Sequence, residues 1–219
     1  NTDDGSCVVL NPLTLVVDDN FENYLENNGM GDGIMMNNYV YTSNIQNVTN
    51  LDISGLAIMD FSGIENFISL QELRCQDNGL MFGGGGPTSL SLPHASNLTY
   101  LDCSNNSLSY LLITNCSDLQ FLNCSYNNLT SIDVSTNTLL TDLNLISNDL
   151  TSIYISTNTL LTGLNVGYND LTSIDISTNT LLTNLNVRSN FLTSIDLSQN
   201  TALLSLNINY NELITLDLS

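Results

Sequence analysis

The stretch Leu140–Leu160, LTDLNLISNDLTSIYISTNTL, decides the fold of this chain because it recurs almost unchanged along the sequence. Close copies occupy Leu161–Leu181 and Leu182–Ala202, and the first half begins again at Leu203. The leading leucines set a period of 21 residues, which continues backwards as far as Leu98. A period in this range is typical of a solenoid, in which each repeat buries its apolar edge by stacking on its neighbours.

Each repeat begins with the pattern of a short strand. The alternation LNL at residues 143–145 has a period of two, which indicates a strand with one buried face. Successive repeats would place these strands side by side, about 4.8 Å apart, in a parallel sheet. The second half, from Leu150 through Ile153 to Ile155, repeats the apolar spacing but lacks helical periodicity. We therefore predict a second extended segment that closes the coil.

A column of asparagines follows the predicted strand in the regular repeats. Its members are Asn106, Asn127, Asn148, Asn169, Asn190 and Asn211. A turn enclosed between two layers leaves backbone N–H and C=O groups that need partners. An asparagine amide offers both donors and an acceptor, so we predict a structural role for this column.

The motif L-x-x-L-x-L/C-x-x-N-x-L resembles the leucine-rich repeat. Its companion half, L-T-S-I-D-x-S-x-N-T, with Cys75, Cys103 and Cys124 at the third apolar strand position, is similar to repeats of secreted Bacteroidetes proteins, especially flavobacterial surface proteins. The resemblance covers Val48 to Ser219. It implies a leucine-rich-repeat solenoid with a parallel sheet on its concave face, turns and extended segments on its convex side, and little helix. It also implies a bacterial interaction module, non-enzymatic and secreted or held at the cell surface.

The chain is strongly acidic, with 22 Asp and Glu against 2 Arg and Lys, and a formal net charge of −20. Binding to nucleic acid or to anionic membranes depends on basic side chains, so we expect neither partner. Such a surface favours cationic partners or bound divalent cations. No apolar run approaches the roughly 20 residues needed to cross a bilayer, and membrane insertion is not expected.

Three segments are expected along the chain. Residues 1–15 are interpreted as a linker or as the tail of a preceding module rich in Cys and Asp, in which Asp3 and Asp4 are candidate calcium ligands. Residues 16–47 are interpreted as an N-terminal cap. Residues 48–219 supply about eight repeats, and the last of these is incomplete, which suggests a trimmed sequence.

The N-terminal cap is predicted to contain one short amphipathic helix. Asp18 or Asp19 is the candidate N-cap, and Gly29 follows where the helix would stop. An open solenoid end would expose the apolar edge of the first repeat, so a capping element is expected there. The acidic residues of the helix, including Glu22 and Glu26, are predicted to lie on its solvated face.

An insertion at Met81–Pro87, MFGGGGP, interrupts one repeat. Its four glycines predict a mobile loop, and Met81 and Phe82 at its base are candidate ligand contacts. A phosphate cradle is a weak reading, because no strand–loop–helix pattern surrounds the glycines.

Metal and thiol chemistry have little support in the sequence. His94 is the single histidine, and no Cys-x-x-Cys or His-x-x-His pair occurs, so no zinc site is expected. The cysteines at the third apolar strand position are interpreted as small buried side chains. The pairing of Cys7 and Cys116 is left open.

Repeat proteins usually bind through the outward positions of their strands. One such column reads Glu72, Tyr100, Phe121, Asp142, Gly163, Asn184 and Ser205, and the next reads Arg74, Asp102, Asn123, Asn144, Asn165, Asn186 and Asn207. From these and the adjoining columns we select as candidate ligand contacts Tyr100, Phe121, Tyr126, Asn144, Asn165, Tyr168, Asn186, Arg188 and Tyr210. Aromatic rings among amides and hydroxyls suit sugars, and they also form hot spots of protein interfaces. The asparagines have a second interpretation, as a ladder that stabilises the sheet.

The opposite edge of the repeats carries a column of carboxylates, Asp133, Asp175, Asp196 and Asp217. Stacked carboxylates repel each other by ~1 kcal/mol per pair even in a water-like dielectric. The column is therefore either spread apart in solvent or relieved by a divalent cation, and we keep a calcium site as a hypothesis. No other cofactor is expected.

Three classes of function follow from these patterns. The first is a non-catalytic extracellular recognition or adhesion module that binds a glycan or a protein through the concave face. The alternative is a solenoid that binds ice or a mineral surface through its Thr, Ser and Asn arrays, such as Thr138, Thr159 and Thr180. An enzyme is not expected, because no nucleophile, base and partner converge in the repeat pattern. The sequence leaves the oligomeric state open.

Overall fold

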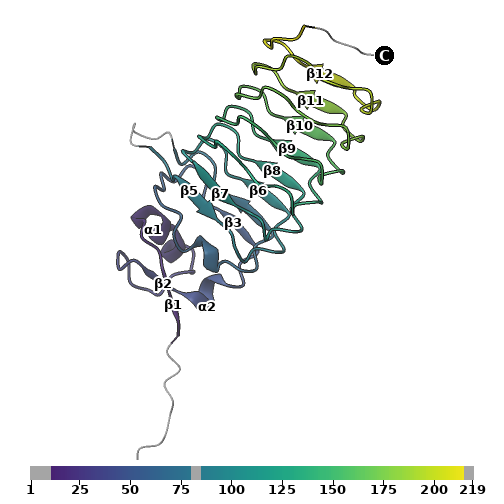
Figure 1. Ribbon diagram of the computed structural model, residues 1–219. Coiled ribbons are helices and arrows are strands. Elements are labelled where there is room, and N and C mark those ends of the chain that lie inside the picture. The colour runs from purple at the N-terminus through teal and green to yellow at the C-terminus, as the bar shows by residue number, and fades with distance from the viewer. Residues whose placement is uncertain (1–10, 80–84, 215–219) are drawn as a thin grey trace, which may run out of the picture.

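The computed structural model describes residues 11–79 and 85–214. These residues wind into an elongated β-solenoid with a small helical unit at its N-terminal end (Figure 1). One parallel sheet of eight strands runs along the solenoid in the order β12-β11-β10-β9-β8-β6-β4-β3. The strands are β3 (Asn50–Asp52), β4 (Glu72–Arg74), β6 (Tyr100–Asp102), β8 (Phe121–Asn123), β9 (Asp142–Asn144), β10 (Gly163–Asn165), β11 (Asn184–Asn186) and β12 (Ser205–Asn207). The predicted solenoid and parallel sheet are confirmed.

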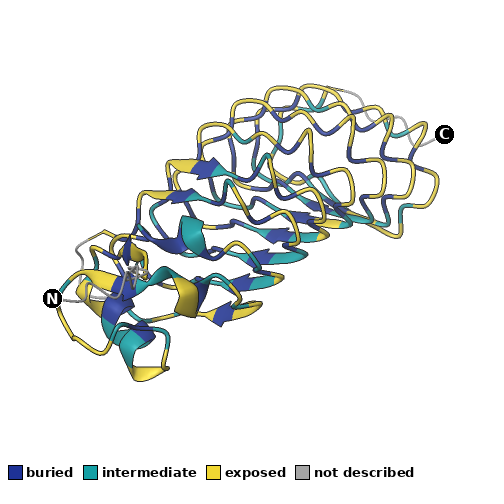
Figure 2. Cartoon of the chain, turned by 90° about the horizontal axis from the view of Figure 1, so that it is seen from below, coloured by how far each residue is buried: buried dark blue, intermediate teal, exposed yellow. Residues whose placement is uncertain are grey.

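The register of the sheet follows the 21-residue period. Leu143 of β9 is opposite Leu122 of β8 and Leu164 of β10, so the central leucines form one column. These leucines are buried, whereas the strand residues on either side of them are intermediate or exposed. Figure 2 shows the corresponding change along the strands of the sheet from buried to intermediate or exposed residues. We call the outward side of the eight-stranded sheet the concave face.

The second halves of the repeats form the opposite, convex side of the coil. Two of them contain the strands β5 (Ser89–Ser91) and β7 (Tyr110–Leu112), which pair in parallel. Later repeats hold extended segments there, and Ile155 and Ile176 point into the core. The only helix in the repeats' described residues is the one-turn η1 (Ile64–Asn66), so the predicted extended segment is confirmed.

The N-terminal unit contains an antiparallel pair, β1 (Leu13–Leu15) and β2 (Tyr39–Tyr41), and two helices, α1 (Asp19–Asn27) and α2 (Thr42–Ile45). Asp18 is the N-cap of α1, because its carboxylate accepts hydrogen bonds from the backbone N–H groups of Asn20 and Phe21 at 2.9 and 3.0 Å. The ring of Phe21 stacks on Phe67 with 6.2 Å between centroids, which joins this unit to the repeats. None of the helices in the described segments is long and apolar enough to cross a membrane.

The prediction that Glu22 is solvated is wrong. Its side chain is buried, and its two oxygens accept hydrogen bonds from the backbone N–H groups of Asn37 and Asn38 at 2.9 and 3.0 Å. Glu26 similarly accepts from the N–H of Asp32 at 2.7 Å. These carboxylates hold the largely exposed loop before β2 against α1, because they accept hydrogen bonds from its backbone N–H groups.

The asparagine column after the strand has the predicted structural role. Asn148 donates from Nδ2 to the carbonyl oxygens of Cys124 and Leu145, and its Oδ1 accepts from the N–H of Leu129 at 3.0 Å. Asn127 and Asn169 make the same set of bonds one repeat away. Each amide therefore joins its own turn to the preceding repeat.

A second asparagine column, not singled out in the sequence, lies at the convex turn. Its members Asn137, Asn158, Asn179 and Asn200 are buried. Asn158 donates to the carbonyl oxygens of Val134 and Asn137 in the preceding repeat at 3.0 and 2.9 Å. Its Oδ1 has no hydrogen-bond partner, and the other three members are alike in this. This column thus satisfies backbone acceptors only.

The cysteines of the described residues are free and buried, as expected for the strand column. A hydrogen bond with Cys124, together with burial, raises the pKa of Cys103 well above its usual range. Cys116 replaces an asparagine of the convex column, its thiol lies 3.7 Å from the carbonyl oxygen of Leu92, and burial raises its pKa to about 12. The thiols of Cys103 and Cys116 are therefore protonated, and all four described cysteines are packed in the core. Cys7, Asp3, Asp4, Met81 and Phe82 lie outside the described residues.

Candidate functional site

The structure divides the candidate contacts into two groups. Tyr100, Phe121, Asn144, Asn165 and Asn186 lie on strands of the sheet and point outward on the concave face. Tyr126, Tyr168, Arg188 and Tyr210 lie beyond the strand ends, along one edge of that face. The two groups are therefore adjacent but distinct surfaces.

A stack of three planar groups crosses the concave face at its N-terminal part. The rings of Tyr100 and Phe121, opposite each other on β6 and β8, lie 4.4 Å apart with an interplanar angle of 3°. The guanidinium of Arg74 lies 4.4 Å from the centroid of Tyr100 and donates to its hydroxyl at 3.1 Å. Arg74 also pairs with Glu72 at 2.7 Å, and this is the single ion pair found within residues 11–79 and 85–214.

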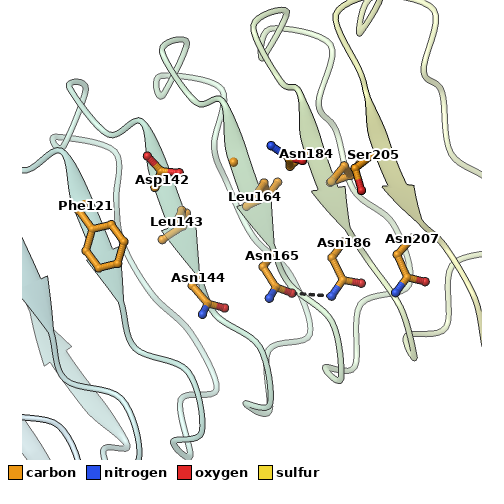
Figure 3. A pocket seen from close by; sticks show the side chains of 12 residues that line it. Phe121, Asp142, Leu143, Asn144, Leu164, Asn165, Asn184, Asn186, Ser205 and Asn207 are labelled. Atoms are coloured by element: carbon orange, nitrogen blue, oxygen red, sulfur yellow. Dashed lines mark hydrogen bonds between the residues drawn. The ribbon is translucent and has the colours of Figure 1, made fainter.

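A groove of about 450 Å³ begins where this stack ends. It runs from Phe121 on β8 to Asn207 on β12, over the outward side chains of five strands (Figure 3). Phe121 forms one end, because Tyr100 covers one face of its ring and the groove lies on the other side. The groove includes three of the predicted asparagines and one of the predicted aromatic residues.

In most asparagines of the groove, the amide oxygen bonds to the protein backbone, whereas most of the NH₂ groups are free of hydrogen bonds to the described residues. The Oδ1 of Asn144, Asn165 and Asn186 each accepts the backbone N–H two residues later, at 3.2, 3.3 and 3.0 Å. Asn186 also donates to Asn165 at 2.9 Å, as the dashed line in Figure 3 marks. The NH₂ groups of Asn144, Asn165 and Asn207 make no hydrogen bond to any described residue. Within the groove, the predicted ladder of asparagines is therefore limited to the bond between Asn186 and Asn165. The other three NH₂ groups can donate hydrogen bonds to a ligand.

Two residues that the sequence analysis did not select form the floor of the groove. Gly163 leaves a gap in the outward column, and the carboxylate of Asp142 leans into it. A methyl group added at Gly163 would lie only 2.8 Å from Asp142 Oδ1. In the sequence, the outward column that contains Tyr100 and Phe121 changes from aromatic residues to Asp142 and Gly163. This change is the sequence feature from which the site could have been predicted.

The three turn tyrosines share an unusual backbone. Tyr126, Tyr168 and Tyr210 have φ values of 54°, 53° and 58°, in the left-handed region that favours glycine or asparagine. Ser147 and Ser189 take the same conformation in the intervening repeats. The tyrosine rings are exposed, so every second repeat presents an aromatic side chain from this turn.

Arg188 lies between two of these rings. Its guanidinium carbon is 5.4 Å from the centroid of Tyr168 and 4.7 Å from that of Tyr210. No carboxylate pairs with it in the part of the chain that the structure describes. The edge of the concave face therefore carries one positive charge held between aromatic rings in an otherwise acidic protein.

The predicted carboxylate column is exposed on the other side of the molecule. Hydrogen bonds from the hydroxyl and the backbone N–H of Ser177 hold the pKa of Asp175 below its usual range. Ser135 does the same for Asp133, and Asp196 accepts from the N–H of Ser198. Asp217 lies outside the described residues. Across the described ranges, no three potential ligands gather into a metal cluster, and calcium binding stays a hypothesis.

The fold and its site define a leucine-rich-repeat solenoid. Among solved structures, the chain is similar to the functional domain of InlJ from Listeria monocytogenes, which is described as including a cysteine ladder. The two share 30% identity over 96% of this chain and 50% of that one, with a TM-score of 0.68.

Two further solved structures have the same fold. A Leptospira interrogans leucine-rich-repeat protein is 26% identical over 80% of this chain and 52% of its own, with a TM-score of 0.62. An internalin C2 from Listeria monocytogenes is 18% identical over 94% of this chain and 88% of its own, with a TM-score of 0.70. The present chain thus spans about half the length of the first two proteins. No protein-family model matches the sequence, and no curated protein does.

Proposed function

We propose that this protein is a non-catalytic extracellular recognition module, secreted or held at a bacterial surface, and that its concave face binds a protein or a glycan. The observation that carries the proposal is the groove of about 450 Å³ between Phe121 and Asn207. Its floor combines an aromatic ring, a carboxylate and amide donors, which is the mixture of apolar and directional contacts typical of binding sites. The similarity to other leucine-rich-repeat proteins supports an interaction role.

The turn tyrosines extend this surface. Backbone strain at exposed aromatic residues is tolerated where it serves recognition. Tyr168, Arg188 and Tyr210 lie on adjacent repeats at the edge of the face, so a large ligand would contact both the groove and this edge.

The test is a parallel screen of the protein on a glycan array and on a display library of peptides. Two variants remove concave contacts: Asn144/Asn165/Asn186→Ala for the groove and Tyr126/Tyr168/Tyr210→Ala for the edge. Tyr154→Ala is the matched control, because Tyr154 is highly exposed but lies on the convex side. We expect selected ligands to lose at least tenfold in affinity with a concave variant and to be unaffected by the control. Loss with Tyr154→Ala alone, or no ligand in either library, would contradict the proposal.

A second candidate is binding to a crystalline surface such as ice or a mineral. It is favoured by one observation: Thr138, Thr159 and Thr180 are all exposed at the same repeat position and form a regular column. Neighbouring Leu139 and Leu160 are each 40% exposed, which gives the column an apolar border. Thermal hysteresis measured on the purified protein tests this function. A freezing point equal to the melting point would dismiss the ice-binding form.

A further inference from the structure

The aromatic pair on the concave face has an acidic residue on each side. In register across four neighbouring strands lie Glu72, Tyr100, Phe121 and Asp142. The order acid–aromatic–aromatic–acid is therefore symmetric along the solenoid. Only the groups that occupy the two ends differ.

At the first end, the protein supplies its own cation. The guanidinium of Arg74 lies 4.4 Å from the centroid of Tyr100 and pairs with Glu72 at 2.7 Å. A planar cation against an aromatic face, fixed by a carboxylate, combines a cation–π contact with a charge-assisted hydrogen bond. This end of the stack is complete.

At the second end, the cation is missing. The position on β9 that corresponds to Arg74 on β4 is Asn144, and Asp142 pairs with no Arg or Lys of the described chain. One oxygen of Asp142 accepts from the hydroxyl of Thr141 at 2.9 Å, and the other lies above Gly163. The second face of Phe121 borders the groove beside this carboxylate (Figure 3).

We propose that Phe121 and Asp142 form a binding site for the guanidinium of an arginine side chain carried by a basic segment of a protein partner. The arginine would repeat, from outside, the contacts that Arg74 makes within the chain. The site deepens the proposed function, on which it rests, by naming the class of ligand for the groove.

Two other features match a basic peptide. The formal net charge of −20 attracts a cationic partner and raises its rate of association. The free NH₂ groups of Asn144, Asn165 and Asn207 follow Asp142 along the groove, and they can donate to the backbone carbonyls of an extended segment. A planar guanidinium stacks on a ring more readily than an ammonium does, which favours arginine over lysine.

The test is an NMR titration of the isotope-labelled full chain with N-acetyl-arginine amide at low ionic strength. Its neutral analogue N-acetyl-citrulline amide, of nearly the same shape, and a methyl glucoside are titrated in parallel. We expect saturable shifts at Phe121, Asp142 and Gly163 with the arginine probe only. Phe121→Leu and Asp142→Asn should each weaken binding about fivefold, the size of one exposed cation–π contact or ion pair.

Two matched variants control for charge and for packing. Asp149→Asn removes the same charge, and Phe191→Leu makes the same ring substitution, but both residues are exposed and lie outside the groove. We expect neither to change the affinity. Equal weakening by Asp149→Asn, equal binding of citrulline, or stronger binding of the glucoside at the same residues would overturn the proposal.

The outcomes also separate this site from the proposed function. Ligands from the library screen that need the concave face, combined with no arginine binding at Phe121, would remove the arginine site and leave the recognition function. Absence of any concave-face ligand in both experiments would remove both proposals.

Discussion

A tyrosine with positive φ occupies the same turn in every second repeat of the C-terminal half. A left-handed backbone costs a residue with a bulky side chain about 1–2 kcal/mol, which asparagine largely avoids because its side chain bonds locally. The ring of Tyr126 is 54% exposed and makes no ring contact among the described residues that would offset this cost.

We therefore predict that Tyr126→Asn stabilises the protein by about 0.5–1 kcal/mol, roughly half of this backbone cost. Tyr168→Asn is the matched comparison and should stabilise less, because it also removes the contact with Arg188. Urea unfolding followed by circular dichroism measures both. A loss of stability with Tyr126→Asn would mean that its ring packs more favourably than its exposure indicates.

A second residue-scale prediction concerns Asp175. Because the hydroxyl of Ser177 donates to it, the folded pKa of Asp175 is lower than the unfolded one. This difference stabilises the folded protein at pH above the unfolded pKa and is lost as the pH falls through the folded pKa. Ser177→Ala should raise the pKa of Asp175 towards its ordinary value in an NMR titration. Asp133, paired with Ser135, should keep its value in the same variant.

At the scale of the element, the two asparagine columns should differ in their contribution to stability. Asn148→Ala leaves the buried N–H of Leu129 without a partner. The carbonyls of Cys124 and Leu145 each lose one of two donors and keep the amide of Asn127 or Asn169. We expect a loss of about 1–3 kcal/mol. In Asn158→Ala no N–H loses its acceptor, because the Oδ1 of Asn158 has no partner. The carbonyls of Val134 and Asn137 each keep a backbone N–H donor, so the loss of stability should be smaller. Chemical unfolding of both variants ranks them, and the reverse order would contradict this assignment of bonds.

The elements that could be predicted are those that the period repeats. Leu143 and Asn148 are predictable because each copy of the repeat places the equivalent residue in the same environment. The burial of Leu143 follows from the period-two apolar pattern of the strand. The bonds of Asn148 follow from the need of the enclosed backbone N–H and C=O groups for partners. Glu22 was not predictable, because its partners are the N–H groups of an irregular loop that no pattern marks. A helix-face rule assigns such a carboxylate to solvent.

The candidate site was predictable only in part, for a related reason. Phe121 and Asn165 follow from the outward strand positions. Asp142 and Gly163 were in the same column, but their role depends on the direction in which the carboxylate leans, and this direction is set by neighbours in space. Strands of three residues also place Tyr168 on a turn, which repeat alignment alone does not reveal.

At the scale of the whole molecule, the net charge dominates. With 22 acidic residues against 2 basic ones, the folded chain repels itself, and salt should screen this repulsion. We predict that the melting temperature rises with sodium chloride.

If the column of Asp175 and Asp196 binds calcium, then millimolar calcium should raise the melting temperature above its value in sodium chloride of the same ionic strength, and a chelator should reverse the effect. Equal melting temperatures with calcium and with magnesium would remove the calcium hypothesis.

Arg74 closes one end of the aromatic stack, and this gives the groove a polarity. A bound chain would start at Phe121 and could extend only towards β12, since the opposite direction is filled by Tyr100 and Arg74. Each additional repeat would lengthen such a groove by about 4.8 Å without changing its origin. Duplication of a 21-residue unit would then lengthen the ligand segment that the groove can bind. The site at Phe121 that fixes the first bound residue would stay unchanged, so the two properties can evolve separately.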